Sequence, residues 1–207
     1  MSYETQRGLM VERHLRARGI RDERVLAAMG SIARELFVPE RYRAHAYDDE
    51  PLPIGEGQTI SQPFMTALMA QLLRLTGTEN VLEVGAGCGY SAAVLGALAA
   101  RVVTIERVPE LAEMARRNLA AFANVLVVKG DGSAGYAPLA PFDAISVAAA
   151  SAEVPPALEQ QLADPGWLVI PVGPENEQEL RVVRKAGGVV ESRVATHCRF
   201  VPLIEPG

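Results

Sequence analysis

The sequence is poor in the residues from which metal sites and disulfide frameworks are built. It holds 2 cysteines and 3 histidines among 207 residues. Cys88 and Cys198 are too few for a disulfide framework, and His14, His45 and His197 lack the spacing of zinc ligands. We therefore expect no metal centre.

Long apolar runs are also missing. The longest uncharged apolar stretch is shorter than the roughly 18 residues that a membrane-spanning helix needs. Residues 1–19 lack the apolar run of a secretory signal peptide. These two absences predict a cytoplasmic protein with no membrane partner.

An excess of basic residues is absent as well. The chain has 20 Lys and Arg against 25 Asp and Glu, a net charge of -5. Such a balance disfavours a nucleic-acid partner, because phosphate backbones attract basic surfaces. The first fifty residues contain nine arginines but also nine acidic residues. We expect these arginines to lie on solvated faces of helices.

The N-terminal third has helical patterning followed by a long connection. Apolar residues recur at helical intervals from Gln6 to about Pro39, and Asp22 suits the N-cap of a second short helix. Residues 38–63 are rich in proline and glycine, which predicts an irregular connection of a length that is more often functional than idle. The apolar stripe over residues 65–73 predicts a helix packed on the core.

From Asn80 onward, apolar strands alternate with helices. Near-continuous apolar strands in such an alternation predict a parallel sheet with helices on both faces. Three strand-like runs beyond Gly173 have no helices between them, which predicts an antiparallel edge. The predicted strands are Val81 to Val84, Val102 to Glu106, Val125 to Lys129, Ala144 to Val147 and Leu168 to Val172, and the predicted helices are Ser91 to Ala99, Pro109 to Phe122 and Val154 to Leu162.

A glycine-rich loop joins the first of these strands to the next helix. The run is Glu83-Val84-Gly85-Ala86-Gly87-Cys88-Gly89, and bare backbone at a helix N-terminus is suited to nucleotides. An NAD fingerprint needs its third glycine one position later. The spacing E-x-G-x-G-x-G instead resembles motif I of the Rossmann-like, class I S-adenosyl-methionine-dependent methyltransferases. Taken alone, the loop is equally compatible with a tight turn that binds no ligand.

Two carboxylates follow the next two strands. Glu106 lies 21 positions after Gly85, where an acid can accept hydrogen bonds from both ribose hydroxyls. Asp131 follows the third strand; alone, its Gly-Asp-Gly run is more often a turn. The carboxyl ends of parallel strands share one edge of the sheet, so we expect the glycine loop, Glu106 and Asp131 to meet at one cleft.

The whole chain resembles the protein-L-isoaspartate O-methyltransferases. The matching segments run in family order from the N-terminal helices to the last strand, and the Thr59-Ile60-Ser61 segment is the most specific. They are Phe37-Val38-Pro39-Glu40, Leu52-Pro53-Ile54-Gly55, Gly57-Gln58-Thr59-Ile60-Ser61-Gln62-Pro63, Val81-Leu82-Glu83-Val84-Gly85, Gly130-Asp131-Gly132 with Gly135-Tyr136, Ala140-Pro141-Phe142-Asp143-Ala144-Ile145, Val154-Pro155-Pro156-Ala157-Leu158, Ile170-Pro171-Val172-Gly173 and Phe200-Val201-Pro202-Leu203.

The resemblance implies a fold and an activity. The fold is one methyltransferase domain over residues 1–207, with a mostly parallel seven-stranded sheet. Residues 1–63 would cover the cleft, and residues 64–207 would form the S-adenosyl-methionine-binding core. The activity is methyl esterification of the free carboxylate of isoaspartyl residues in damaged proteins and peptides, which starts repair through a succinimide. We expect a monomer.

The same resemblance assigns roles to residues. It implies that Ser61 orients the acceptor carboxylate; on the residues alone, Ser61 could equally be an N-cap of the following helix. No metal ligands are implied. The cofactor-binding residues that it implies are Gln58, Thr59, Ile60, Glu83, Gly85, Ala86, Gly87, Gly89, Glu106, Arg107, Asp131 and Gly132.

Three other functions fit part of the pattern. A peptide-tailoring enzyme would methylate a normal aspartate of one dedicated substrate with the same fold and cofactor. A silent binding module would keep the cleft but lose Glu83, Glu106, Asp131 or Ser61, and the chain retains all four. An NAD oxidoreductase is disfavoured by the glycine spacing.

Overall fold

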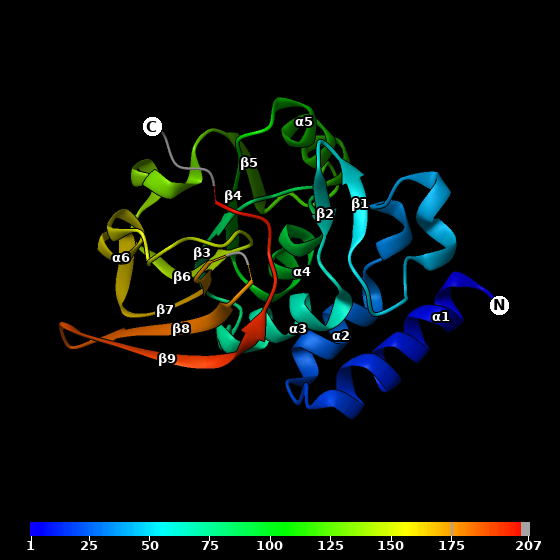
Figure 1. Ribbon diagram of the computed structural model, residues 1–207, viewed down its shortest axis with the longest axis horizontal. Helices are drawn as coiled ribbons and strands as arrows, with labels where there is room; N and C mark the ends of the chain where they lie inside the picture. The colour runs from blue at the N-terminus through cyan, green and yellow to red at the C-terminus, as the bar shows by residue number, and fades with distance from the viewer. Residues whose placement is uncertain (175, 204–207) are drawn as a thin grey trace.

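The centre of the molecule is a seven-stranded sheet. The structure, a computed structural model, describes residues 1–174 and 176–203. The strand order is β5-β4-β3-β6-β7-β8-β9 (Figure 1). Strands β3 to β7 pair in parallel, and β8 and β9 are added antiparallel, which confirms the predicted fold class. The strands are β3 (Asn80–Val84), β4 (Arg101–Glu106), β5 (Val125–Lys129), β6 (Phe142–Val147), β7 (Leu162–Val172), β8 (Gln178–Ala186) and β9 (Val189–Cys198).

Helices cover both faces of this sheet, as predicted. Successive strand residues point to opposite faces, so Val81 belongs to one buried cluster and Leu82 to another. The first cluster includes residues of α1 to α5, and the second includes Leu158 of α6. Among the described residues, none of the helices combines the length and the apolarity that crossing a bilayer requires. The helices are α1 (Tyr3–Met10), α2 (Glu23–Ser31), α3 (Pro63–Leu72), α4 (Tyr90–Leu98), α5 (Pro109–Asn118) and α6 (Pro156–Gln161).

The N-terminal helices pack beside the sheet and end at definite signals (Figure 1). Helix α1 continues through irregular helical turns to Arg18 and stops at Gly19, whose φ is 103°. The carboxylate of Asp22 accepts the backbone N–H groups of Arg24 and Val25 at 2.9 and 3.3 Å. The predicted N-cap of α2 is therefore confirmed.

Residues 38–63 are more regular than the sequence predicted. Strands β1 (Leu52–Gly55) and β2 (Gln58–Ile60) form a small antiparallel pair, and a short 3₁₀ helix, η4 (Glu40–His45), precedes them. Gly55 at the end of β1 and the two turn residues, Glu56 and Gly57, all have positive φ. The prediction of an irregular connection is wrong for this hairpin, which adds a second, smaller sheet near the carboxyl edge of the main one (Figure 1).

The boundaries of two helices and one strand also differ from the predictions. Helix α5 ends at Asn118 rather than at Phe122. The helix predicted up to Leu162 is shorter, and β7 already begins at Leu162 instead of Leu168. The added length of β7 contains a break in its pairing with β6, and a turn-like Asp-Pro-Gly run within it concealed the strand.

Candidate functional site

A cleft opens at the carboxyl ends of β3, β4 and β5, where a parallel sheet binds its ligands. The glycine loop (residues 85–89) follows β3 and forms one wall, and the hairpin exit (residues 58–61), which runs along β2 toward α3, forms another. All predicted site residues line this first cleft except Glu83 and Gly89. The predicted residues that line it are Gln58, Thr59, Ile60, Ser61, Gly85, Ala86, Gly87, Glu106, Arg107, Asp131 and Gly132.

The glycine loop is fixed by backbone hydrogen bonds to β4. The N–H groups of Gly85 and Ala86 both donate to the carbonyl of Ile105, at 2.9 and 3.1 Å. Gly89 has a φ of 90°, and a Cβ there would lie 2.9 Å from the side chain of Leu119 in the segment after α5. Gly89 therefore allows close packing behind the cleft instead of lining it.

Glu106 anchors the same loop through one carboxylate oxygen and the segment after β4 through the other. Its Oε2 accepts the N–H of Gly87 at 2.9 Å, and its Oε1 accepts the N–H of Val108 at 3.0 Å. The side chain is 7% exposed and lines the cleft. Each carboxylate oxygen has a further lone pair, so Glu106 can hold the loop and still accept hydroxyl groups of a ligand.

Glu83 lies beneath the cleft with no exposed surface. Its Oε2 accepts the hydroxyl of Thr104 at 2.6 Å, while Oε1 has no hydrogen-bond partner among the described residues. Burial raises the pKa of Glu83 to about 7, and the charge of Glu106 adds to this, whereas the hydroxyls of Ser91 and Thr104 oppose it. Direct contact of Glu83 with a cofactor stays a prediction.

Asp131 and Cys88 also lie at the first cleft. The Oδ1 of Asp131 accepts the N–H and the hydroxyl of Ser133, at 3.0 and 2.9 Å, so the turn expected for its Gly-Asp-Gly run is present. Burial raises the pKa of the Cys88 thiol to about 11. A thiol with so high a pKa is a poor nucleophile at neutral pH.

Ser61 stands where two clefts meet. It lines the first cleft and also a second one, bordered by Arg18, Phe64 and the segment from Thr196 to Pro202. The N-cap of α3 is Gln62, without a side-chain hydrogen bond, and Pro63 begins the helix. The alternative that Ser61 is an N-cap is therefore wrong, and its hydroxyl is not needed to start the helix.

The C-terminal segment completes the first cleft, a position that the sequence did not predict. Val201, Pro202 and Leu203 line the cleft. Backbone hydrogen bonds join Ala150 to Val201 and to Leu203, at 2.8 and 2.7 Å. The run Phe200 to Leu203 matches the family pattern, but only the fold brings it beside the ends of the central strands.

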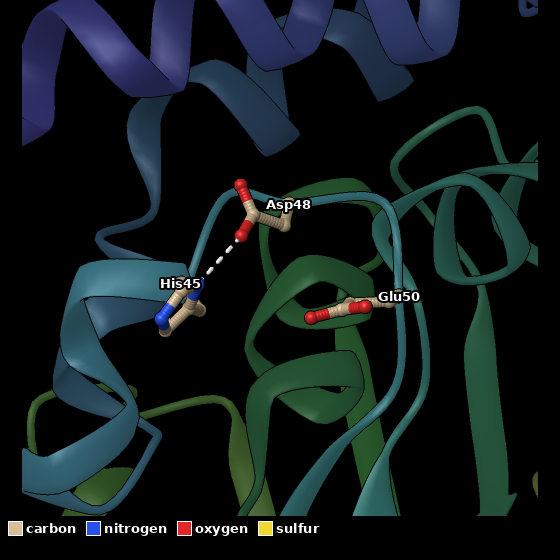
Figure 2. A group of neighbouring side chains, drawn as sticks. All are labelled: His45, Asp48 and Glu50. Atoms are coloured by element: carbon tan, nitrogen blue, oxygen red, sulfur yellow. Dashed lines mark hydrogen bonds and ion pairs between the residues drawn. The ribbon is translucent and has the colours of Figure 1, made fainter.

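One group outside both clefts has the residue types of a metal site. His45 ends η4, and Asp48 and Glu50 lie on the connection from η4 to β1; Figure 2 shows His45 facing Asp48. The Nδ1 of His45 lies 2.8 Å from the Oδ2 of Asp48. All three side chains are exposed. Exposed groups of this kind are common without an ion, so we assign no metal site to them.

Comparisons with known proteins agree along the whole chain. A sequence profile described as "Protein-L-isoaspartate(D-aspartate) O-methyltransferase (PCMT)" matches residues 5–206. The chain is 53% identical over 204 residues to the protein-L-isoaspartate O-methyltransferase of Koribacter versatilis, covering 98% of this chain and 92% of that protein. It is 53% identical over 201 residues to the enzyme of the same name from Methanoculleus marisnigri, covering 96% and 91%.

A solved structure gives the same result at lower identity. The chain superposes with a TM-score of 0.85 and 26% identity on a protein-L-isoaspartate O-methyltransferase from Plasmodium falciparum in complex with S-adenosyl-L-homocysteine. The match covers 99% of both chains. This chain belongs to the protein-L-isoaspartate(D-aspartate) O-methyltransferase family.

Proposed function

We propose that this protein transfers the methyl group of S-adenosyl-methionine to the free carboxylate of L-isoaspartyl residues in damaged proteins and peptides. The ester would then close to a succinimide, whose hydrolysis restores part of the normal aspartate. The observation that carries the proposal is the position of Ser61, on the boundary between a cleft with a glycine loop and a second cleft with room for a peptide. The family to which the chain belongs and the S-adenosyl-L-homocysteine in the Plasmodium falciparum structure support it.

The first cleft fits this cofactor by its set of donors and acceptors. Backbone at positive φ lies beside the N-terminal end of α4, where Tyr90 and Ser91 line the cleft. Glu106 can accept ribose hydroxyls, and Asp131 can accept the adenine amine. The residues that would hold the cofactor are Gln58, Thr59, Ile60, Gly85, Ala86, Gly87, Glu106, Arg107, Asp131 and Gly132. Glu83 and Gly89 would act from behind, through the loop.

The main contribution of the protein to this reaction is to align the acceptor carboxylate with the methyl group. S-adenosyl-methionine supplies a sulfonium that already activates the methyl group. The acceptor carboxylate is ionised at neutral pH, so no proton needs to be removed from it. The Ser61 hydroxyl would donate to one carboxylate oxygen and leave the other free to attack. Such positioning contributes roughly 7 to 11 kcal/mol to lowering a barrier, and a dry cleft favours a transition state in which opposite charges cancel.

The second cleft is the proposed path of the peptide. Arg18, Phe64, His197 and Arg199 line it around Ser61. The guanidinium of Arg18 lies 3.8 Å from the ring centroid of Phe64 and pairs with Asp49. A peptide lying there would bring one side chain past Ser61 into the first cleft while its neighbours stay outside.

Three features of the organisation remain part of the proposal. Residues 1–63 would act as a cover for the cleft, because the hairpin exit forms one of its walls. Residues 64–207, of which 175 and 204–207 lie outside the described residues, would form the cofactor-binding core of the same single domain. We further infer a monomer and a cytoplasmic location; the two free cysteines are consistent with a reducing compartment.

Repair itself is the test of this function. The protein is incubated with S-adenosyl-methionine and a synthetic isoaspartyl peptide, and the peptide forms are separated by chromatography over several hours. We expect the isoaspartyl form to decline and the aspartyl form to accumulate, with no change when the cofactor is omitted. A methyl ester on the normal aspartyl peptide, with the isoaspartyl form unchanged, would favour the tailoring function instead.

A further inference from the structure

Arg34 is an arginine in an unusual environment. It begins the 3₁₀ helix η3 (Arg34–Leu36), and its side chain has no exposed surface. From the sequence we expected the N-terminal arginines on solvated helix faces, and for Arg34 that expectation is wrong. A fully buried arginine is rare in proteins unless it is paired, because removing its charge from water is costly.

Backbone carbonyls and an aromatic ring surround the buried guanidinium. Its Nε donates to the carbonyl of Ala46 at 2.7 Å, and its Nη2 donates to the carbonyl of Ser61 at 2.8 Å. Its central carbon lies 4.8 Å from the ring centroid of Tyr90. Nη1 has no hydrogen-bond partner among the described residues.

The nearby carboxylates are engaged elsewhere. The adjacent Glu35 accepts the hydroxyl of Tyr47. Asp49 exerts an attraction on Arg34, but its oxygens accept the N–H of Phe64 and pair with Arg18. Burial lowers the pKa of Arg34, yet a guanidinium stays charged at any physiological pH. The positive charge is thus held in place by dipoles and a ring face.

Two of the groups that Arg34 contacts are walls of the first cleft. Ser61 and Tyr90 both line it, whereas Arg34 itself lines neither cleft. The hydrogen bond to Ser61 spans 27 residues of sequence and fixes the backbone that places the serine hydroxyl. A charge buried behind a wall acts at longer range than an exposed one, because the protein interior screens it weakly.

We propose that Arg34 is a positioning residue for the methyl acceptor, which it serves by fixing the main chain of Ser61 and by placing an unpaired positive charge behind the site of the acceptor carboxylate. The inference rests on the proposed function, since it takes the acceptor to be a carboxylate. Lysine cannot replace Arg34, because one ammonium cannot reach two carbonyls in the way a planar guanidinium does.

Two variants separate the two contributions. Arg34→Lys keeps the charge and loses the double hydrogen bond, so we expect kcat for an isoaspartyl peptide to fall roughly tenfold to a hundredfold with KM little changed. Arg34→Gln also loses the charge, so we expect a similar fall in kcat together with a higher KM for the peptide. Calorimetric affinity for S-adenosyl-L-homocysteine should stay within about twofold in both.

Arg24 provides the matched control. It also bridges two backbone carbonyls, those of Leu75 and Leu98, at 2.6 and 3.1 Å, and none of these three residues lines a cleft. We expect Arg24→Lys to lower the melting temperature somewhat without changing kcat or KM. Cooperative unfolding shows that an Arg34 variant is folded. One folded Arg34 variant is enough for the comparison of kcat and KM with Arg24→Lys.

Amide hydrogen exchange tests the structural role of Arg34 independently of the proposed function, because it requires no substrate. Amides of residues 58–62 should exchange faster in Arg34→Lys than in the parent and in Arg24→Lys, whichever substrate the enzyme accepts. A folded Arg34→Lys with parental exchange over 58–62 and parental kcat would overturn the inference. If the parent methylates no isoaspartyl peptide while exchange still changes as expected, the proposed function fails and the structural part of the inference stands.

Discussion

The two walls of the first cleft are held in place by different means. The glycine loop is fixed by backbone hydrogen bonds to β4 and by the carboxylate of Glu106, all within the parallel sheet. Residues 58–60 of the hairpin exit pair with β1, and the main chain of Ser61 beyond them is held by the side chain of Arg34, which reaches it from a separate 3₁₀ helix. The glycine loop is thus built into the main sheet. The hairpin exit, with the predicted cofactor residues 58–60 and the proposed acceptor residue Ser61, lies outside that sheet and is held by β1 and by one long-range side chain. Four variants test this description of the cleft. They are given in order from the largest expected change in free energy to the smallest.

Glu83→Gln should have the largest effect, on stability. The folded pKa of about 7 lies above the ordinary value of 4.5, so the folded protein binds the extra proton and the parent loses stability as pH rises from about 4.5 to 7. A shift of this size corresponds to a loss on the order of 3 kcal/mol. Urea unfolding at pH 5 and pH 8 measures this loss. The free energy of unfolding of the variant, relative to that of the parent, should be higher at pH 8 than at pH 5. If the free energy of unfolding changed equally with pH in the two proteins, the raised pKa of Glu83 would be contradicted.

Glu106→Ala should weaken cofactor binding about 100-fold, or about 2.7 kcal/mol. It removes a predicted ribose acceptor and also the anchor of the Gly87 and Val108 amides. Calorimetry with S-adenosyl-L-homocysteine gives the dissociation constant, and Glu110→Ala, at an exposed site of α5, is the control. Normal affinity in Glu106→Ala would show that the ribose lies elsewhere.

Gly89→Ala should destabilise the fold by about 2 kcal/mol, because alanine at a φ of 90° is strained and its Cβ would press on Leu119. Thermal unfolding measures this loss. Gly8→Ala is the matched change in α1, where a Cβ has open space around it, and it should be neutral or slightly stabilising. Equal effects of the two substitutions would mean that the loop tolerates a side chain behind the cleft.

Ser61→Ala should lower kcat about tenfold, or about 1.4 kcal/mol, by removing one hydrogen bond to the acceptor. Affinity for S-adenosyl-L-homocysteine should change little. Ser31→Ala removes a hydroxyl of similar kind at the end of α2 and should leave kcat unchanged. If Ser61→Ala lost cofactor affinity instead of turnover, the assignment of Ser61 to the acceptor would be wrong.

The glycine loop could be predicted from sequence because its determinants are local or follow from sheet regularity. Glycines at fixed spacing predict the turn, and parallel pairing brings the ends of β3, β4 and β5 to one edge. Glu83 shows the limit of this reasoning, because a motif residue inside a strand points to whichever face the pleat gives it. It lies beneath the cleft rather than in it.

The hairpin exit was harder to predict. Strands β1 and β2 are only four and three residues long and lie in a segment rich in proline and glycine, so their alternation is too short to detect. The Gly55-Glu56-Gly57 turn was the available signal. Arg34 gave none, since its burial results from elements that only the tertiary fold brings around it.

The central claim is methyl transfer to an isoaspartyl carboxylate, and the most direct test is an initial-rate assay with labelled S-adenosyl-methionine. Two synthetic peptides are compared that differ only in having an isoaspartyl or a normal aspartyl linkage. We predict base-labile label on the isoaspartyl peptide alone. Label on neither peptide, with S-adenosyl-L-homocysteine bound normally, would contradict the account.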